Sequence, residues 1–235
     1  MNAPLFLLSL SAATLAQAAV VSVNFGPGSN NLAPSDNAGQ PGSLVSQWYN
    51  ISSVASFTDI PDDAGLSTSL DVTVQSGGQF SSWSSGTAQQ NMIFGVFGDR
   101  SGQGLTSTLS FADVPYAMYD VVVYLGKAPW ENSRQVDTTI GSTTYFSTVN
   151  SFDGTTFTQS TATTSGGRDA GNYVIFSGLS LANFDLTATF TSPDANAWGS
   201  GISGVQIVQS IPEPGSYAAL AGGLALGLVA LRRRR

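Results

Sequence analysis

A segment between two expected strands gathers residues that suit the binding of a sugar. The stretch from Lys127 to Arg134 holds a tryptophan, an acid and two bases. An aromatic face stacks on the C–H surface of a sugar ring, while charged or amide groups hold its hydroxyls. Trp130, Glu131 and Arg134 are therefore candidate ligand-binding residues. The alternative is that Trp130 caps the edge of the core and that Glu131 pairs with Arg134.

The other three tryptophans lie in different sequence settings. Trp198 precedes the last expected strand, and it suits a core position as well as a ligand platform. Its loop can share one end of the fold with the Trp130 loop or lie at the opposite end. Trp83, between serines, is a further ligand-binding candidate. Trp48, next to Tyr49, is expected to be buried.

Several kinds of chemistry are excluded by missing residue types. The chain has no histidine and no cysteine, which excludes Ser-His-Asp catalysis, histidine- or thiolate-bound metals and disulfides. Glycoside hydrolysis needs two facing carboxylates, and nothing indicates such a pair, although glutamate and aspartate are both present. Asp62-Asp63 and Asp153-Gly154 are typical turn formers. We predict no catalytic residue, no cofactor and no metal ligand, a structural Ca²⁺ being the one ion that acidic loops would suit.

The net charge of −7 conceals an uneven distribution of bases. Four of the eight basic residues are the last four residues of the chain. Without the segment from Ile211 on, which also holds Glu213, 14 acidic and 4 basic residues remain, and the net charge is −10. Because such a body repels phosphates, we expect no nucleic acid partner.

The first 18 residues have the features of a secretory signal. Leu5 to Leu15 is a short apolar stretch, and Ala16-Gln17-Ala18 is a small-x-small cleavage site before Ala19. No lysine or arginine precedes the apolar stretch, so only the α-amino group supplies positive charge there. We expect export and removal of residues 1–18; a buried N-terminal element is the alternative.

The last 25 residues predict a membrane segment. Pro212-Glu213-Pro214 cannot join a helix or sheet, because its prolines fix φ and lack a donor. Gly215 to Leu231 is 17 residues without charge, at the short limit for a spanning helix. A basic end follows and should stay cytoplasmic; it consists of Arg232, Arg233, Arg234 and Arg235.

This order of motif, apolar helix and basic end resembles the PEP-CTERM sorting tail of Gram-negative bacteria. The resemblance covers Ile211 to Arg235. It implies recognition near Pro212-Glu213-Pro214 by an exosortase, a membrane transpeptidase. It also implies transient anchoring in the inner membrane and delivery to the cell surface or exopolysaccharide matrix. The alternative is a plain linker to an anchor, without cleavage.

Residues 19–210 show the period-2 alternation of strands that have one face on a core and one in water. The patterns centre on Val21 to Phe25, Leu70 to Val74, Leu105 to Phe111 and Phe184 to Phe190. Two continuous apolar runs, Val121 to Leu125 and Tyr173 to Phe176, are expected to be central strands. No amphipathic helix is expected in this body, and its many threonines are spaced irregularly. The prediction is an all-β, two-sheet antiparallel sandwich of jelly-roll type.

The body also resembles malectin-like and galactose-binding-like jelly rolls. The resemblance rests on Ser22 to Gly26, Tyr119 to Tyr124 and Gly201 to Ile207, in that order. It implies carbohydrate binding. We therefore expect an exported, non-catalytic surface or matrix protein that binds polysaccharide. A structural or adhesive matrix protein without a pocket is the alternative, and a glycoside hydrolase is the least favoured one.

Overall fold

The structure is a computed structural model, and it describes residues 18–75, 78–83, 86–99, 106–129, 133–191 and 199–210. Ala19–Ser210 forms one compact unit. The predicted signal segment and the predicted C-terminal tail lie outside the described residues, apart from Ala18. Within the described ranges, no helix is long and apolar enough to cross a membrane.

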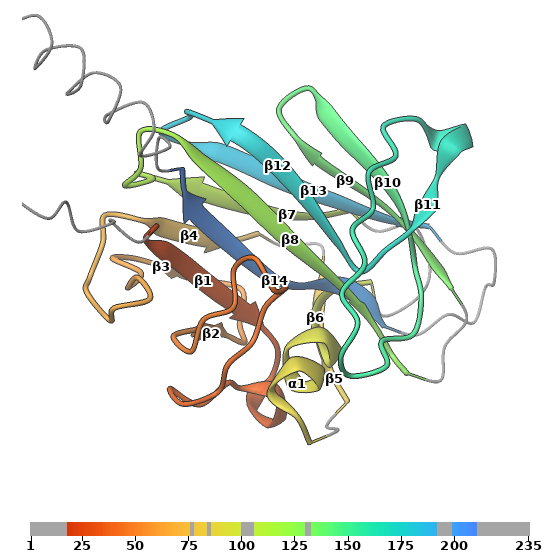
Figure 1. The fold of residues 1–235 in the computed structure, drawn as a ribbon, viewed down its shortest axis with the longest axis horizontal. Coiled ribbons are helices and arrows are strands. Elements are labelled where there is room, and N and C mark those ends of the chain that lie inside the picture. Colours follow the sequence, from red (N-terminus) through yellow and green to blue (C-terminus); the bar gives the residue numbers. More distant parts are fainter. Residues whose placement is uncertain are drawn as a thin grey trace, which may run out of the picture. The chain divides into compact units, whose positions relative to one another are not determined.

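Two seven-stranded sheets make up the body (Figure 1). The first sheet has the order β12-β8-β14-β1-β2, and β6 and β5 continue from the free part of β14. Its strands are β12 (Tyr173–Leu179), β8 (Tyr119–Lys127), β14 (Ser200–Gln209), β1 (Val20–Phe25), β2 (Tyr49–Ile51), β6 (Gly95–Asp99) and β5 (Gln79–Ser82).

The second sheet has the order β11-β10-β9-β13-β7-β4-β3. Its strands are β11 (Asp169–Ala170), β10 (Thr143–Val149), β9 (Arg134–Ile140), β13 (Phe184–Thr191), β7 (Thr106–Ala112), β4 (Asp71–Val74) and β3 (Ser56–Phe57). The helical elements of the described residues are α1 (Ala88–Phe94) and the 3-10 turns η1 (Gly28–Asn30) and η2 (Ser165–Gly167).

The main core lies between the two sheets, which confirms the prediction of an all-β sandwich. Val123 of β8 and Val205 of β14 meet Leu109 of β7 and Leu186 of β13 in one buried cluster. The alternation predicted for β4, β7 and β13 places apolar side chains in this core and polar ones on the other face. The prediction that all pairing is antiparallel is wrong, because β1 pairs with β2 and β10 pairs with β11 in parallel.

A second apolar cluster covers the outer face of the first sheet, and this cluster explains two wrong predictions. It joins Trp48, Met92, Phe94, Tyr124 and Phe152 with neighbouring residues. The segment between β1 and β2 continues this cover, because the Asn30 carbonyl accepts from the Asn24 side chain at 2.9 Å, so β1 is buried on both faces and not on one. The short helix α1 was not predicted from the sequence. Its N-terminus carries a capping box, formed by Thr87 and Gln90.

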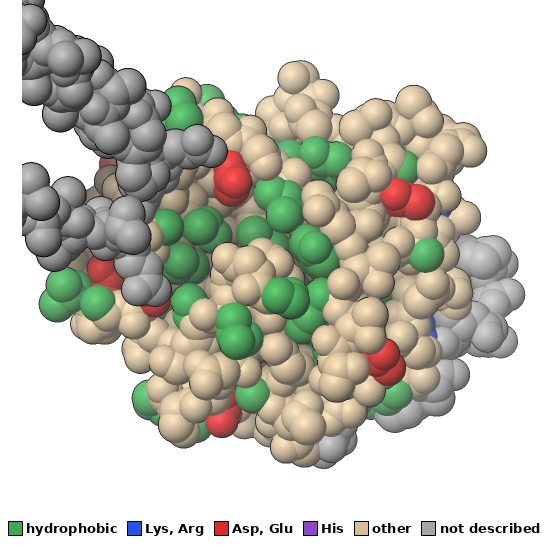
Figure 2. Space-filling view, in the orientation of Figure 1, with side chains coloured by type: hydrophobic (Ala, Val, Ile, Leu, Met, Phe, Trp, Pro, Cys, Tyr) green, Lys and Arg blue, Asp and Glu red, His purple; other side chains and the backbone are tan. Residues whose placement is uncertain are grey.

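A further correction concerns the run from Tyr173 to Phe176, which was expected to be a central strand and lies in β12 (Tyr173–Leu179). It is the edge strand β12 of the first sheet. Its apolar run is explained by cover from outside the sheet, because Phe157 packs edge-on against both Tyr124 and Tyr173. Figure 2 shows apolar side chains gathered over this face, with isolated carboxylates among mostly neutral groups.

A buried hydrogen-bond network fixes the loop that precedes β2 to the first sheet. The Gln206 Oε1 atom accepts from the hydroxyls of Tyr124 and Ser43, each at 2.6 Å. Its amide nitrogen donates to Ser22 Oγ at 3.0 Å and to the Ser43 carbonyl at 2.8 Å. Because every polar atom of this amide is paired, the network adds rigidity without leaving an unpaired buried group.

Candidate functional site

The strand ends beside the predicted binding segments lie together at one end of the sandwich, which we call the loop end. In the first sheet, Ser200 of β14 pairs with Asp99 of β6 and with Lys127 of β8. In the second sheet, Arg134 at the start of β9 pairs with Val149 at the end of β10. The described residues that flank 130–132 and 192–198 therefore belong to the same end, which answers the question that the sequence left open.

A short segment after β10 joins the two sheets at the loop end. The Lys127 ammonium group donates to Ser151 Oγ at 2.9 Å and to the Ala128 carbonyl at 3.1 Å. The Ser151 hydroxyl donates to the Pro129 carbonyl at 3.2 Å. The Ser133 hydroxyl donates to Asn150 Oδ1 at 2.8 Å. Both described neighbours of 130–132 are thus held by Asn150 and Ser151.

The structure describes only part of the predicted ligand-binding set. Trp130, Glu131 and Trp198 lie outside the described residues. Arg134 is buried at the first position of β9, with 2% of its surface exposed. Trp83 is half-buried and packs against the second apolar cluster, where its ring occupies the space beside Gly199.

Trp48 is buried, as predicted. It is 5% exposed, and its indole N–H donates to the Val45 carbonyl at 3.2 Å. Its ring packs edge-on against Tyr124. Trp48 is therefore a core residue and not a ligand platform.

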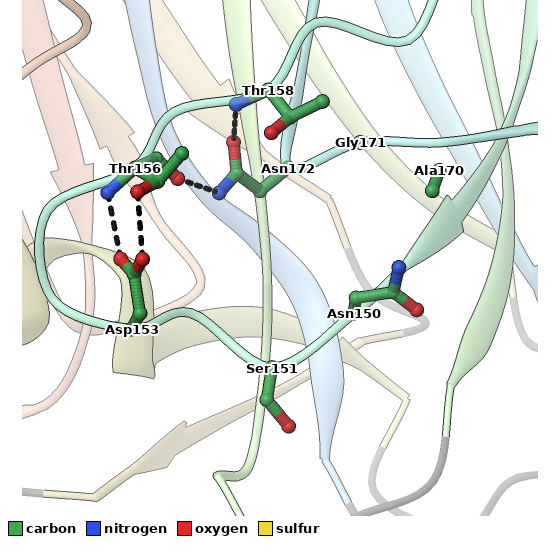
Figure 3. A pocket seen from close by; sticks show the side chains of 8 residues that line it. All are labelled: Asn150, Ser151, Asp153, Thr156, Thr158, Ala170, Gly171 and Asn172. Atoms are coloured by element: carbon green, nitrogen blue, oxygen red, sulfur yellow. Dashed lines mark hydrogen bonds between the residues drawn. The ribbon is translucent and has the colours of Figure 1, made fainter.

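A polar pocket with a volume of about 200 Å³ adjoins the loop end (Figure 3). Its wall is formed by the segment after β10 and by the turn between β11 and β12. The lining residues are Asn150, Ser151, Asp153, Thr156, Thr158, Ala170, Gly171 and Asn172. Asn150 and Ser151 therefore both line the pocket and hold the residues on either side of 130–132.

The pocket wall is fixed by side-chain hydrogen bonds. Asp153 Oδ1 accepts from the backbone N–H groups of Thr155 and Thr156, at 2.8 and 2.7 Å. Asp153 Oδ2 accepts from the Thr156 hydroxyl at 2.6 Å. These hydrogen bonds hold the pKa of Asp153 well below its usual range, because they stabilise the carboxylate.

Asn172 ties the two parts of the wall together. Its Oδ1 atom accepts from the Thr158 N–H at 2.9 Å, and its amide nitrogen donates to the Thr156 carbonyl at 3.0 Å. Figure 3 shows Asn172 between these two threonines, with Asn150 on the other side of the pocket. Asn172 thus acts as a bridge that keeps the turn near Thr156 in place.

Sequence reasoning missed this pocket. The Asp153-Gly154 pair was interpreted as a turn, and Asp153 does form one. Asn150, Thr158 and Asn172 carry no local signal, because each is an ordinary polar residue of a loop. The pairing of β10 with β11, at Ser147 and Thr148, and the bridge between Gln159 and Tyr173 bring these residues together.

The acidic residues do not gather as metal ligands in the part of the chain that the structure describes, where no group of three His, Cys, Asp or Glu side chains could hold an ion. Asp62 accepts from the backbone N–H groups of Ala64 and Leu66, which is the turn role expected for it.

Comparison with known proteins gives no relative from which a function could be transferred: no family model, no curated protein and no solved structure matches the chain.

Proposed function

We propose that this chain is an exported, non-catalytic protein of the cell surface or exopolysaccharide matrix, and that its body binds carbohydrate at the loop end. The body would be a sandwich of jelly-roll type. One observation supports the binding role most directly. Asn150 and Ser151 of the polar pocket hold both residues that flank 130–132. The segment with Trp130 and Glu131 therefore begins and ends beside a polar pocket of suitable chemistry.

The binding proposal is tested with a glycan array and an exopolysaccharide pull-down. Trp130→Ala and Trp198→Ala are compared with the unchanged protein, because loss of an aromatic platform removes stacking on the sugar ring. We expect both variants to bind more weakly. Trp48→Phe serves as the control, since Trp48 is buried and does not line the pocket. Equal binding by all four proteins would remove the tryptophans from the site.

The sorting proposal rests on the sequence of the two ends. We propose that residues 1–18 are removed on export and that an exosortase-type transpeptidase processes the chain near Pro212-Glu213-Pro214. Its inner-membrane anchor would be Gly215 to Leu231, with the C-terminus cytoplasmic. Mass spectrometry of the surface-exposed protein tests both steps. Peptides that retain Arg232 to Arg235 would contradict the processing.

A structural or adhesive role is the second candidate, and the packing of two tryptophans favours it. Trp48 is buried and Trp83 packs against the second apolar cluster, as a protein without an aromatic ligand platform would show. This role predicts self-association of the protein in the absence of glycan. Light scattering coupled to size-exclusion chromatography tests the structural role, because a protein that stays monomeric without glycan would contradict it.

A further inference from the structure

The polar pocket contains hydrogen-bonding groups that the protein itself leaves free. Asn150 uses its Oδ1 atom to accept from Ser133, while its amide nitrogen has no partner among the described residues. The Thr158 hydroxyl is likewise without a partner in the described part of the chain, although its backbone N–H is bound by Asn172. Asn172 donates one of its two amide protons to the Thr156 carbonyl and keeps the other. These groups are neutral, and they include both donors and acceptors.

The groups are held in place before any ligand arrives. Asp153 fixes the turn at Thr155 and Thr156, and Asn172 fixes Thr158. Phe152 and Phe157, each next in sequence to lining residues, pack in the second apolar cluster with their ring centroids 5.1 Å apart. A wall fixed in this way loses little conformational entropy on binding, which favours recognition of a small rigid ligand.

The charges around the pocket disfavour an anion. The described residues include three bases, and none presents a free cationic surface: Lys127 is 1% exposed, Arg134 is 2% exposed, and the Arg168 side chain is 13% exposed and paired with Asp137. The pocket rim carries the Asp153 carboxylate, which stays ionised because its hydrogen bonds lower its pKa. The Asp153 carboxylate and the net charge of −10 of the body repel negatively charged ligands.

We infer that the polar pocket binds one uncharged sugar ring of a neutral glycan and rejects uronate rings. This inference rests on the proposed carbohydrate binding and adds its ligand class and a subsite. The pocket has a volume of about 200 Å³, below the ~300 Å³ at which sites for drug-sized ligands begin, so it suits a single sugar ring better than several. The Asn150 amide donates to a ring hydroxyl, and Thr158 and Asn172 complete the set of polar partners.

The test uses the full chain in a detergent without a sugar head group. Calorimetry compares oligosaccharides of glucose, galactose and mannose with oligomers of glucuronate and galacturonate. Asn150→Asp keeps an acceptor for Ser133 and removes both amide donors, so affinity for the neutral oligosaccharide should fall about tenfold or more. Thr158→Val keeps the side-chain shape and should lower affinity about threefold to tenfold.

Two matched variants control for charge and for loss of a hydroxyl elsewhere. Asn183→Asp places the same new charge on an exposed asparagine whose Oδ1 atom likewise accepts one hydrogen bond, in this case from the Asp113 N–H. Thr143→Val removes an exposed hydroxyl at the other end of β10, ~20 Å from Val149. Both controls should bind the neutral oligosaccharide as the unchanged chain does.

The outcomes separate this inference from the proposal on which it rests. Absence of binding to every oligosaccharide would overturn the proposed function itself. Binding that depends on Trp130 but is unchanged by Asn150→Asp and Thr158→Val would overturn only the pocket assignment. Stronger binding of the uronate oligomers would overturn the preference for neutral sugars.

Discussion

Gly199 lies directly before β14. Its backbone conformation and the space around it both favour glycine over other residues. Its φ is +64°, in the left-handed region that other residues enter only with strain. A Cβ atom there would lie 1.9 Å from the Trp83 ring. We predict that Gly199→Ala lowers the free energy of unfolding by about 3 kcal/mol or more, through strain and displacement of Trp83. Urea titration measures the loss.

Gly141 provides the matched comparison for Gly199. Its φ of +58° is similar, and a Cβ atom there would meet nothing within 4 Å. Gly141→Ala therefore reports only the backbone cost, ~1–2 kcal/mol. Equal losses in the two variants would show that the contact with Trp83 has no energetic weight.

Tyr119 links the stability of the fold to alkaline pH. Burial raises the pKa of Tyr119 to about 12, and its hydroxyl donates to the Leu181 carbonyl at 2.7 Å. The unfolded tyrosine ionises near pH 10, so above that pH the unfolded state loses its proton first. The free energy of unfolding should therefore fall as pH rises from about 10 to about 12.

Urea midpoints measured between pH 8 and about pH 11.5 check this dependence. Tyr119→Phe removes one ionising group, so its alkaline decline should be shallower, although Tyr116 has a similarly raised pKa of about 12 and contributes to the remainder. Identical slopes in the variant and the unchanged protein would argue against a role for Tyr119.

At the scale of elements, Arg168 lies between η2 and β11 and links this edge of the second sheet to the strands β9 and β10. Its guanidinium group donates to the carbonyls of Val136 in β9 and Ser147 in β10, at 3.2 and 3.1 Å. It also pairs with Asp137 at 2.6 Å and covers the Phe146 ring at 5.4 Å from the centroid. One side chain thus satisfies groups on two neighbouring strands and holds the edge of the sheet.

We predict that Arg168→Ala lowers the free energy of unfolding by about 2 kcal/mol, because two carbonyls and a partly buried carboxylate lose their partner. Arg168→Lys keeps the charge but not the planar fork, so it should restore only part of the loss. Hydrogen exchange of β11 and the end of β10 should quicken in both variants. Unchanged hydrogen exchange in β11 and at the end of β10 would show that Arg168 does not stabilise this edge of the sheet.

The sequence predicted β1, β4, β7, β8, β12 and β13. Period-2 alternation at β4, β7 and β13 reflects burial of one face on the main core, and the continuous apolar run at β8 reflects burial of both faces. The prediction that one face of β1 is exposed to water was wrong, and so was the prediction that β12 is a central strand. The outer cover of β1 comes from the segment before β2, and that of β12 comes from the loop with Phe157; local periodicity reports neither. The sequence also did not show which strands pair with one another. Irregularly spaced threonines align in register across four strands in the structure; they are Thr108, Thr187, Thr139 and Thr144.

The candidate site shows the same division between local and distant information. Tryptophan-bearing segments were found from their composition, and the burial of Trp48 was predicted correctly. The polar pocket was not found, since Asn150 and Asn172 are 22 positions apart and line one pocket through pairing that the sequence does not report. The sequence predicted the turn at Asp153. The position of that turn beside the loop end could be found only from the structure.

At the scale of the whole molecule, the charge balance of the body predicts how salt affects its stability. Its net charge is −10, and the bases of the described residues are buried or paired. Repulsion among carboxylates therefore opposes the compact state. Salt shortens the distance over which they repel, from ~30 Å at 0.01 M to ~8 Å at 0.15 M.

We predict that the Tm of the Ala19–Ser210 body rises by about 2–4 °C over this range of NaCl, equivalent to about 1 kcal/mol. The variant Asp36→Asn/Asp185→Asn keeps side-chain oxygens that can accept from Ala33 N–H and the Ser110 hydroxyl, the present partners of these carboxylates. It removes two negative charges, so its Tm should rise less with salt. Calorimetric scans of both proteins, with sucrose as an uncharged additive, isolate the electrostatic part. A Tm that stays constant or falls with NaCl would contradict the prediction. It would show that repulsion among the carboxylates does not lower the free energy of unfolding of the folded body.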